Sequence, residues 1–165
     1  MALLMFSAGL VVEKKPGKNK TKEKKMDIKN CIDFTNENKL CFLATTENGE
    51  PRVRALGFWF ADETGFYFQT GRMKSLYQQL KENPKVETCF YKPENMGGTM
   101  LRISGEIEFL DDKKLKERVM SERPFLKKFG LSADDPRLII FRMDHGQAHF
   151  WTMENNLKPK EIIEF

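Results

Sequence analysis

Residues 51–84, PRVRALGFWFADETGFYFQTGRMKSLYQQLKENP, combine two predicted strands, a turn and the start of a helix in one continuous stretch. Residues 53–60 alternate with the strand period of two, which places Arg54 on the same face as the apolar residues that follow it. The polar run 62–65 ends in glycine and separates two aromatic-rich runs, which predicts a hairpin returning through residues 66–70. This unit favours an antiparallel β fold.

The helix after this hairpin begins around Lys74 and Ser75, because the apolar residues from position 73 onward are spaced at i, i+3, i+4 and i+7. Cations in a first turn lie at the positive end of the helix dipole unless an anion binds there. A preceding glycine, a hydroxyl and the cations Arg72 and Lys74 therefore predict a phosphate site, to which Arg54 adds a third cation. The alternative is that Arg72 and Lys74 are solvated and that Arg54 pairs with a carboxylate on a neighbouring strand.

Length and charge predict a single folded domain that follows a basic N-terminal segment. The 165 residues suit one domain, expected over residues 26–165. Residues 13–25 contain seven lysines and two glutamates, a charge of +5, so the rest of the chain carries −1 of the total of +4. We expect residues 1–25 to be a disordered or extended basic segment. A near-neutral domain argues against a specific nucleic-acid-binding function.

The cysteines and the apolar N-terminus favour a cytoplasmic protein. Cys31, Cys41 and Cys89 are an odd number with no CxxC pair and no histidine set beside them, so we expect reduced thiols and no metal site. Residues 1–12 are too few to span a bilayer, and they lack the basic start and small-residue cleavage site of a signal peptide.

The remaining pattern predicts short strands with helices outside them. Gly105, inside a long alternating strand, indicates a bulge or a close approach of two backbones. We expect helices over 27–38 and 111–120, strands over 40–45, 86–91 and 101–109, a closing hairpin of 138–143 with 148–152, and a terminal strand near 162–165. The prediction is a mainly β fold with flanking helices, a six- to seven-stranded antiparallel split β-barrel.

Three runs of sequence resemble the pyridoxamine 5′-phosphate oxidase-like family, the FMN-binding split barrels. The resemblance covers about residues 27–152 and rests on the order and spacing of CFLATTENGEPRVRALGFWF, FYFQTGRMKSLYQQLKENPKV and LRISGEIEFLDD. It implies a homodimer with two FMN molecules at the interface.

The resemblance also implies which residues bind the cofactor. The family's phosphate and ribityl ligands are a strand arginine, an aromatic residue and a threonine on the next strand, and a lysine in the following turn. In this sequence they fall on Arg54, Phe68, Thr70 and Lys74, with Arg72 and Ser75 as helpers. The backbone of Ala55 and Leu56 would lie along the flavin. Trp151, in a segment similar to a late Glu-Phe-Trp of the oxidase, either approaches the flavin or packs in the core of the closing hairpin.

Two departures from the oxidase pattern shape the expected function. Residues 155–158 are Asn-Asn-Leu-Lys, whereas the oxidases have an Arg-Leu-His-x-Arg segment that grips the substrate phosphate, and a glutamine of the oxidase falls near Met100. We therefore expect a substrate other than a B6 vitamer. The leading hypothesis is an FMN flavoprotein, an oxidoreductase acting on an unknown small molecule, in which no side chain is assigned as a catalytic acid or base.

Three other functions fit the same sequence. The first is a non-enzymatic flavin carrier or sensor. The second is a haem-binding split barrel, which would need His145 or His149 as an axial ligand, although both are expected to be turn or surface residues. The third is a deazaflavin-dependent reductase of the same general fold.

Overall fold

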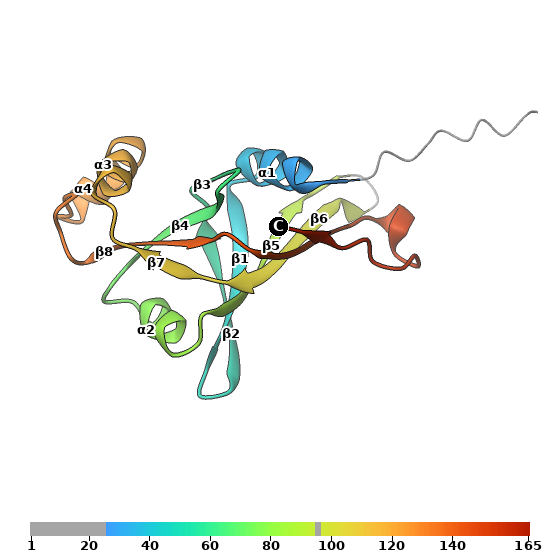
Figure 1. Ribbon diagram of the computed structural model, residues 1–165, viewed down its shortest axis with the longest axis horizontal. Coiled ribbons are helices and arrows are strands. Elements are labelled where there is room, and N and C mark those ends of the chain that lie inside the picture. The colour runs from blue at the N-terminus through green and yellow to red at the C-terminus, as the bar shows by residue number, and fades with distance from the viewer. Residues whose placement is uncertain (1–25, 95–96) are drawn as a thin grey trace, which may run out of the picture.

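The computed structural model describes residues 26–94 and 97–165, shown in Figure 1. The lysine-rich and apolar segments within residues 1–25 lie outside these ranges. Within them, two antiparallel sheets of six and four strands pack as a split barrel rather than a closed one, with four α-helices around them. The predicted fold class is confirmed.

The larger sheet has the strand order β10-β9-β6-β5-β1-β2. Asn48 and Gly49, with φ of 54° and 81°, form the two-residue turn between β1 and β2. This turn fixes the register, so that Leu43 lies opposite Arg54. The strands are β1 Leu40–Glu47, β2 Glu50–Gly57, β5 Lys85–Lys92, β6 Thr99–Glu106, β9 Gly146–Trp151 and β10 Ile163–Glu164.

The smaller sheet has the order β3-β4-β8-β7. Its strands are β3 Phe60–Asp62, β4 Gly65–Gly71, β7 Glu108–Leu110 and β8 Leu138–Met143. The predicted hairpin between residues 60 and 70 is confirmed, with Asp62 opposite Gly65. Two predicted long strands are instead divided: the chain leaves the larger sheet after Gly57 and after Glu106, and enters the smaller sheet within a few residues. These breaks raise the strand number above the predicted six or seven.

The expected closing hairpin of residues 138–143 with 148–152 is wrong. β8 pairs with β4 and β7, whereas β9 pairs with β6 and β10 in the other sheet. The chain changes sheet at Gly146, which lies opposite Gly105 in the β6–β9 ladder. A Cβ atom on Gly105 would collide with the backbone oxygen of His145, which confirms the close approach predicted at this glycine.

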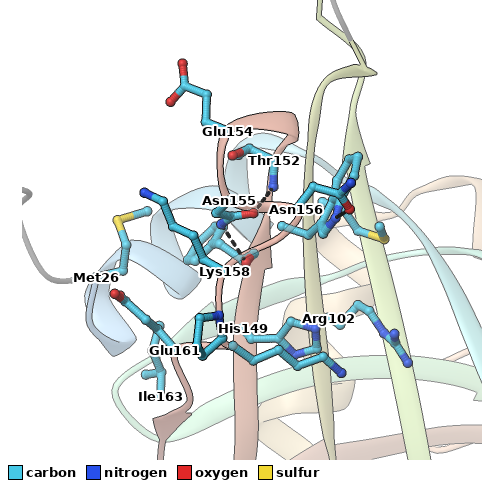
Figure 2. Close-up of a pocket in the computed structure, with 15 residues that line it drawn as sticks. Met26, Arg102, His149, Thr152, Glu154, Asn155, Asn156, Lys158, Glu161 and Ile163 are labelled. Carbon is cyan, nitrogen blue, oxygen red and sulfur yellow. Dashed lines mark hydrogen bonds between the residues drawn. The ribbon is translucent and has the colours of Figure 1, made fainter.

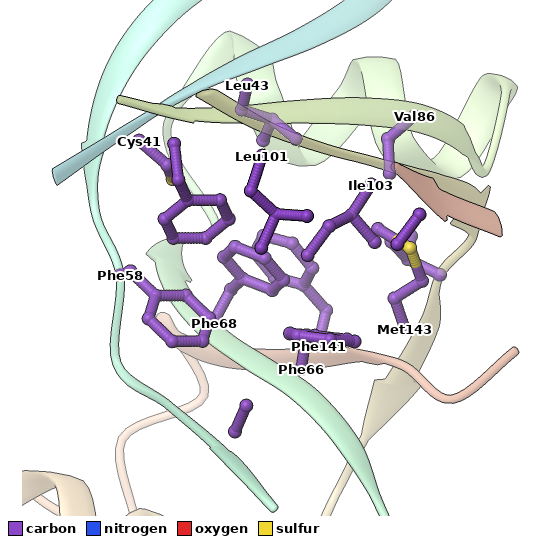
Figure 3. Close-up of a cluster of buried hydrophobic side chains, with 14 of the residues drawn as sticks. Cys41, Leu43, Phe58, Phe66, Phe68, Val86, Leu101, Ile103, Phe141 and Met143 are labelled. Atoms are coloured by element: carbon purple, nitrogen blue, oxygen red, sulfur yellow. The ribbon is translucent and has the colours of Figure 1, made fainter. Parts of the chain in front are cut away.

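The main core fills the space between the two sheets, as Figure 3 shows. The larger sheet contributes Cys41, Leu43, Leu101 and Ile103, and the smaller sheet contributes Phe66, Phe68, Phe141 and Met143. A second cluster lies between the other face of the smaller sheet and the helices at residues 113–128, built around Trp59, Phe60, Tyr67, Val119, Met120, Leu126, Leu138 and Ile140.

The helices begin and end close to the predicted positions. Asp27 caps the first helix, as its side chain accepts a hydrogen bond from the backbone nitrogen of Asn30 at 3.1 Å. In the described ranges, no helix combines the length and the apolar character that a bilayer crossing requires. The helices are α1 Ile28–Glu37, α2 Ser75–Glu82, α3 Lys113–Glu122 and α4 Phe125–Lys128, with a 3₁₀ turn at Met153–Asn155.

Candidate functional site

Arg54 is held by uncharged oxygen atoms from two other elements. Its Nη1 donates to Thr45 Oγ1 at 2.6 Å and to the Leu43 backbone oxygen at 3.3 Å, and its Nη2 donates to Gln79 Oε1 at 2.6 Å. In residues 26–94 and 97–165 no carboxylate forms an ion pair with it. The expected alternative, a carboxylate partner on a neighbouring strand, is not what the structure shows. Arg54 therefore retains capacity for an anionic ligand.

A second layer of polar groups holds Gln79 in position. Its Nε2 donates to Glu47 Oε1 at 3.0 Å, and the other oxygen of Glu47 accepts from Arg52 Nε at 3.0 Å. These contacts, the Gln79 hydrogen bond first, lower the pKa of Glu47, so this carboxylate stays ionised at neutral pH. The amide orientation of Gln79 is thereby fixed, with its oxygen toward Arg54.

The start of α2 has the properties of an anion site. No side chain caps its first amides, and its first turn contains no acidic residue. Lys74 immediately precedes the helix, and both Lys74 and Ser75 are exposed. Ser75 is four residues before Gln79, so the two lie on the same side of the helix about 6 Å apart. Gln79 also contacts Arg54, so the guanidinium meets α2 about one helical turn after its start.

Thr70 supplies a hydroxyl that has no partner within the described part of the chain. Its side chain is 3% exposed, and Oγ1 is fully buried without a hydrogen bond. A buried hydroxyl left in this state costs about 1–3 kcal/mol. Thr70 lies near the end of β4, and the next residue, Gly71, accepts a hydrogen bond from the backbone nitrogen of Lys74 at 3.0 Å.

Four other predicted site residues have side chains that form no hydrogen bond with Arg54 in the described part of the chain. Arg72 donates from Nε to the Pro136 backbone oxygen at 2.9 Å and places its guanidinium 5.4 Å from the centre of the Tyr77 ring. Phe68 is fully buried in the core, stacked on Phe141. Leu56 packs half-buried against the same core, and Ala55 is exposed on the opposite face of β2.

Trp151 is far from Arg54 within one chain. It lies on β9, four strands from β2, which separates the two backbones by about 19 Å. The two side chains also leave opposite faces of the sheet: Arg54 lies opposite buried Leu43, whereas Trp151 lies opposite Met100 on the other face. Trp151 Nε1 donates to Asn156 Oδ1 at 2.9 Å. Trp151 therefore packs in no hairpin core, because that hairpin does not exist.

Trp151 lines a groove of about 640 Å³ between β6, β9 and the C-terminal segment 152–163, shown in Figure 2. His149 and Arg102 also line it. The pKa of His149 is lowered, first by burial and then by the charges of Lys160 and Arg102, so the imidazole is neutral at pH 7. His149 thus lies in a cavity rather than in a turn. His145 is exposed, with Nδ1 2.6 Å from Asp144 Oδ1.

The face of the larger sheet that carries Trp151 is unusually apolar for an exposed surface. We call it the outer face. Leu40, Phe42, Val53 and Tyr91 on it are between 44% and 71% exposed. An exposed apolar patch of this kind marks an interaction surface. Its apolar members are Leu40, Phe42, Ala44, Val53, Ala55, Cys89, Tyr91, Met100 and Trp151.

Sequence reasoning missed Thr45, Gln79 and the groove. The Asn48–Gly49 turn is a signal that could have found Thr45, because the register it sets places Thr45 diagonally across from Arg54. Gln79 carried a weaker signal, its spacing of four from Ser75. The groove carried none, because it depends on how the C-terminal segment returns to the sheet.

Two antiparallel sheets in a split barrel define the structural class of the protein. We refer to Arg54, Thr70, Lys74 and Ser75 together as the cradle. The sequence profile of the pyridoxamine 5′-phosphate oxidase family matches residues 28–152, so the chain belongs to this family.

Solved structures share the fold. A NimC/NimA family protein from Clostridium acetobutylicum is 26% identical with a TM-score of 0.70, over 83% of this chain and 92% of that one. General Stress Protein 26 from Bacillus anthracis str. Sterne is 18% identical with a TM-score of 0.66, over 85% and 100%. PhzG from Burkholderia lata 383, solved in complex with tetrahydrophenazine-1-carboxylic acid, is 16% identical with a TM-score of 0.60, over 84% and 89%. Among curated proteins, none matches the chain.

Proposed function

We propose that the protein is an FMN-binding flavoprotein and an oxidoreductase that acts on a small molecule. The observation that carries this proposal is the guanidinium of Arg54, which has no carboxylate partner in the described ranges and contacts Gln79, about one turn along α2 from its uncapped start. Membership of a family whose members commonly bind flavin supports it. The buried, unpartnered hydroxyl of Thr70 fits the same ligand.

The proposal gives each residue of the cradle a role. Arg54 and Lys74 donate charge-assisted hydrogen bonds to the phosphate, together with the Ser75 hydroxyl and the first amides of α2. Thr70 donates from its hydroxyl to the phosphate or the ribityl chain. The flavin itself supplies hydride or electron transfer, and the protein supplies binding, orientation and exclusion of water.

We also propose that the flavin site is completed by a second copy of the chain. Arg54 and Trp151 lie on opposite faces of one sheet, about four strands apart, so a single chain does not bring both to one ligand. The exposed apolar outer face supplies the surface for such a dimer. In this arrangement the groove with Trp151 and His149 of one copy lies beside the cradle of the other.

His149 makes haem a second candidate cofactor. It is neutral and half-buried and it lines the groove, which are the properties required of an axial ligand. The absorption spectrum separates the candidates, because haem gives a Soret band and FMN gives the two-band spectrum of an oxidised flavin. Mass spectrometry of the released ligand identifies it, including a deazaflavin. Turnover of a reduced pyridine nucleotide with a quinone or nitro compound distinguishes an enzyme from a carrier.

Replacement of Lys74 by alanine tests the cradle directly. Lys74 is exposed and has no side-chain hydrogen bond in the described structure, so Lys74→Ala should fold normally. Loss of one charge-assisted contact, worth about 1.5–3 kcal/mol, should weaken FMN binding by about tenfold or more in a fluorescence titration. Arg54→Ala is a less clean test, because it also removes the hydrogen bonds that Thr45 Oγ1 and Gln79 Oε1 accept from the guanidinium.

Lys85→Ala is the matched control. Lys85 is exposed at the start of β5, and its removal should leave FMN affinity unchanged. Equal FMN affinity of the Lys74 and Lys85 variants would refute the proposed cradle. A purified protein that neither contains flavin nor binds added FMN would refute the proposed function.

A further inference from the structure

A second cleft, of about 600 Å³, opens between α2, β7, the start of α3 and the segment before β8. Figure 1 shows α2 and β7 on the same side of the molecule, away from the C-terminal segment that forms the groove. None of Arg54, Thr70, Lys74 and Ser75 lines this cleft, so it is distinct from the proposed FMN cradle.

The cleft has an aromatic wall and an apolar floor. The rings of Tyr77 and Phe109 meet edge to face with centroids 5.2 Å apart. Phe109 is 38% exposed, so part of its apolar ring remains in contact with water in the cleft. This exposure is unfavourable. The floor is formed by Leu110 and by residues 138–140 of β8. A flat ring placed here would remove the exposed face of Phe109 from water.

The rim of the cleft carries more positive than negative charge. Lys116 pairs with Asp111 at 2.5 Å and Lys113 pairs with Asp134 at 3.1 Å, so these four charges cancel. Two further cations in the lining, Arg72 and Lys81, form no ion pair in the part of the chain that the structure describes.

Arg72 and Lys81 are both directed to the aromatic wall. The Arg72 guanidinium lies 5.4 Å and the Lys81 Nζ 5.8 Å from the centre of the Tyr77 ring. Arg72 Nε is fixed by the Pro136 backbone oxygen, which leaves its terminal nitrogens as donors. Two exposed cations thus flank one aromatic surface, with one guanidinium already oriented.

We propose that this cleft is a second binding site, for a small molecule that combines a flat ring with one anionic group, a phosphate or a carboxylate. The ring packs on Tyr77 and Phe109 above the apolar floor. The anion accepts hydrogen bonds from Arg72 and Lys81. A cleft that offered only charge would bind inorganic phosphate equally well, and one that offered only the ring surface would bind a neutral ring equally well.

The test uses three probes on isotopically labelled protein saturated with FMN, followed by the chemical shifts of backbone amides. Phenyl phosphate carries both ring and charge, inorganic phosphate carries the charge alone, and phenol carries the ring alone. Phenyl phosphate should shift the amides of Tyr77, Lys81 and Leu110, and it should bind about tenfold more tightly than either of the other probes. Phe109→Ala should reduce this advantage over inorganic phosphate.

Reversal of one rim charge gives the decisive comparison. Lys81→Glu should weaken phenyl phosphate binding by about tenfold, whereas Lys114→Glu, an equal charge change on an exposed residue of α3 outside the cleft, should have little effect. Equal weakening by both variants would overturn the proposal, because it would show a general effect of net charge. Shifts confined to the region of Lys74 would also overturn it, by placing the probe in the cradle.

Discussion

Arg54 shows how one residue can remain available to a ligand inside a well-packed sheet. Burial lowers the pKa of Arg54 from the usual value for arginine. An arginine guanidinium nevertheless stays charged at physiological pH. Its contacts are a hydroxyl, an amide oxygen and a backbone oxygen, none of which neutralises that charge. The carboxylate of Glu47 lies one hydrogen bond further away, behind Gln79. This arrangement orients the arginine without neutralising it.

The three thiols should differ in reactivity according to their burial. Burial raises the pKa of Cys31 and of Cys41 to about 12, whereas Cys89 is partly exposed on the outer face. At pH 8 the two buried thiols are almost wholly protonated, so iodoacetamide should modify Cys89 first in a folded chain whose outer face is uncovered, and more slowly in the proposed dimer. Peptide mass spectrometry over a time course measures this order. Faster modification of Cys31 or Cys41 would show that the core opens locally.

The same shifts set a direction for stability at alkaline pH. The folded-state pKa of Cys41 is about 12, above an unfolded value of about 8.5, so the unfolded chain loses this proton first. The contribution of Cys41 is therefore complete below pH 8.5 and falls as pH rises toward 12.

At the scale of elements, short breaks in the strands connect the two sheets. β2 is followed after two residues by β3 in the other sheet, β6 after one residue by β7, and β8 after two residues by β9. Each crossing lets one continuous stretch line both halves of the core. The tightest crossing pairs Gly105 with Gly146, where no side chain fits between the strands.

Gly105→Ala should destabilise the protein through this close approach. The new Cβ would collide with the His145 backbone oxygen and lie 2.9 Å from Met143 Sδ. We expect a loss of about 2–3 kcal/mol in the free energy of unfolding, seen as a fall of about 5–10 °C in Tm.

Gly57→Ala is the matched control for this prediction. A Cβ on Gly57 meets only Arg123 Nη1, at 3.6 Å, which is ordinary contact. Its Tm should stay close to that of the unmodified protein. Similar losses in both variants would contradict the prediction, because a Gly→Ala change at a position where the Cβ fits should stabilise the protein slightly through the entropy of the unfolded chain.

At the scale of the whole molecule, the two faces of the larger sheet differ in burial. The inner face packs on the smaller sheet in the main core. The outer face is left exposed with several large apolar side chains on it. Covering this face with a second copy would stabilise the dimer by about 25 cal/mol for each Å² of apolar surface removed from water.

Phe42→Glu should disrupt the proposed dimer. Phe42 lies in the middle of the outer face, between Ala55 and Cys89, and is 44% exposed in one chain. A buried, unpaired carboxylate at that point would be strongly unfavourable in a dimer and nearly neutral in a monomer. Light scattering coupled to size-exclusion chromatography should give twice the chain mass for the original protein and a single chain mass for the variant.

Phe129→Glu serves as the control, because Phe129 is 70% exposed beyond α4 and lies off the outer face. It should leave the dimer intact. A monomeric original protein would contradict the prediction, as would a Phe42 variant that stays dimeric. If the flavin site is shared, the Phe42 variant should also lose flavin.

Local sequence patterns were sufficient for most elements and for the family. Alternation, helical spacing and the turn at residues 62–65 depend on neighbouring residues, and the helices and the hairpin between residues 60 and 70 that they predict are confirmed. The anion cradle around Arg54 and Lys74 was also predicted from one continuous stretch and stays a prediction until a ligand is measured.

The sequence by itself determined most strand and helix segments, because alternation and helical spacing depend on neighbouring residues, and the order of three runs across residues 27–152 indicated the split-barrel class and the family. Only the tertiary structure decided that β8 and β9 belong to different sheets, that Gln79 and Thr45 hold Arg54, that Arg72 turns to the second cleft, and that Trp151 lies on the far face from Arg54. These features depend on contacts between segments distant in sequence, which are set by how the two sheets pack on one core.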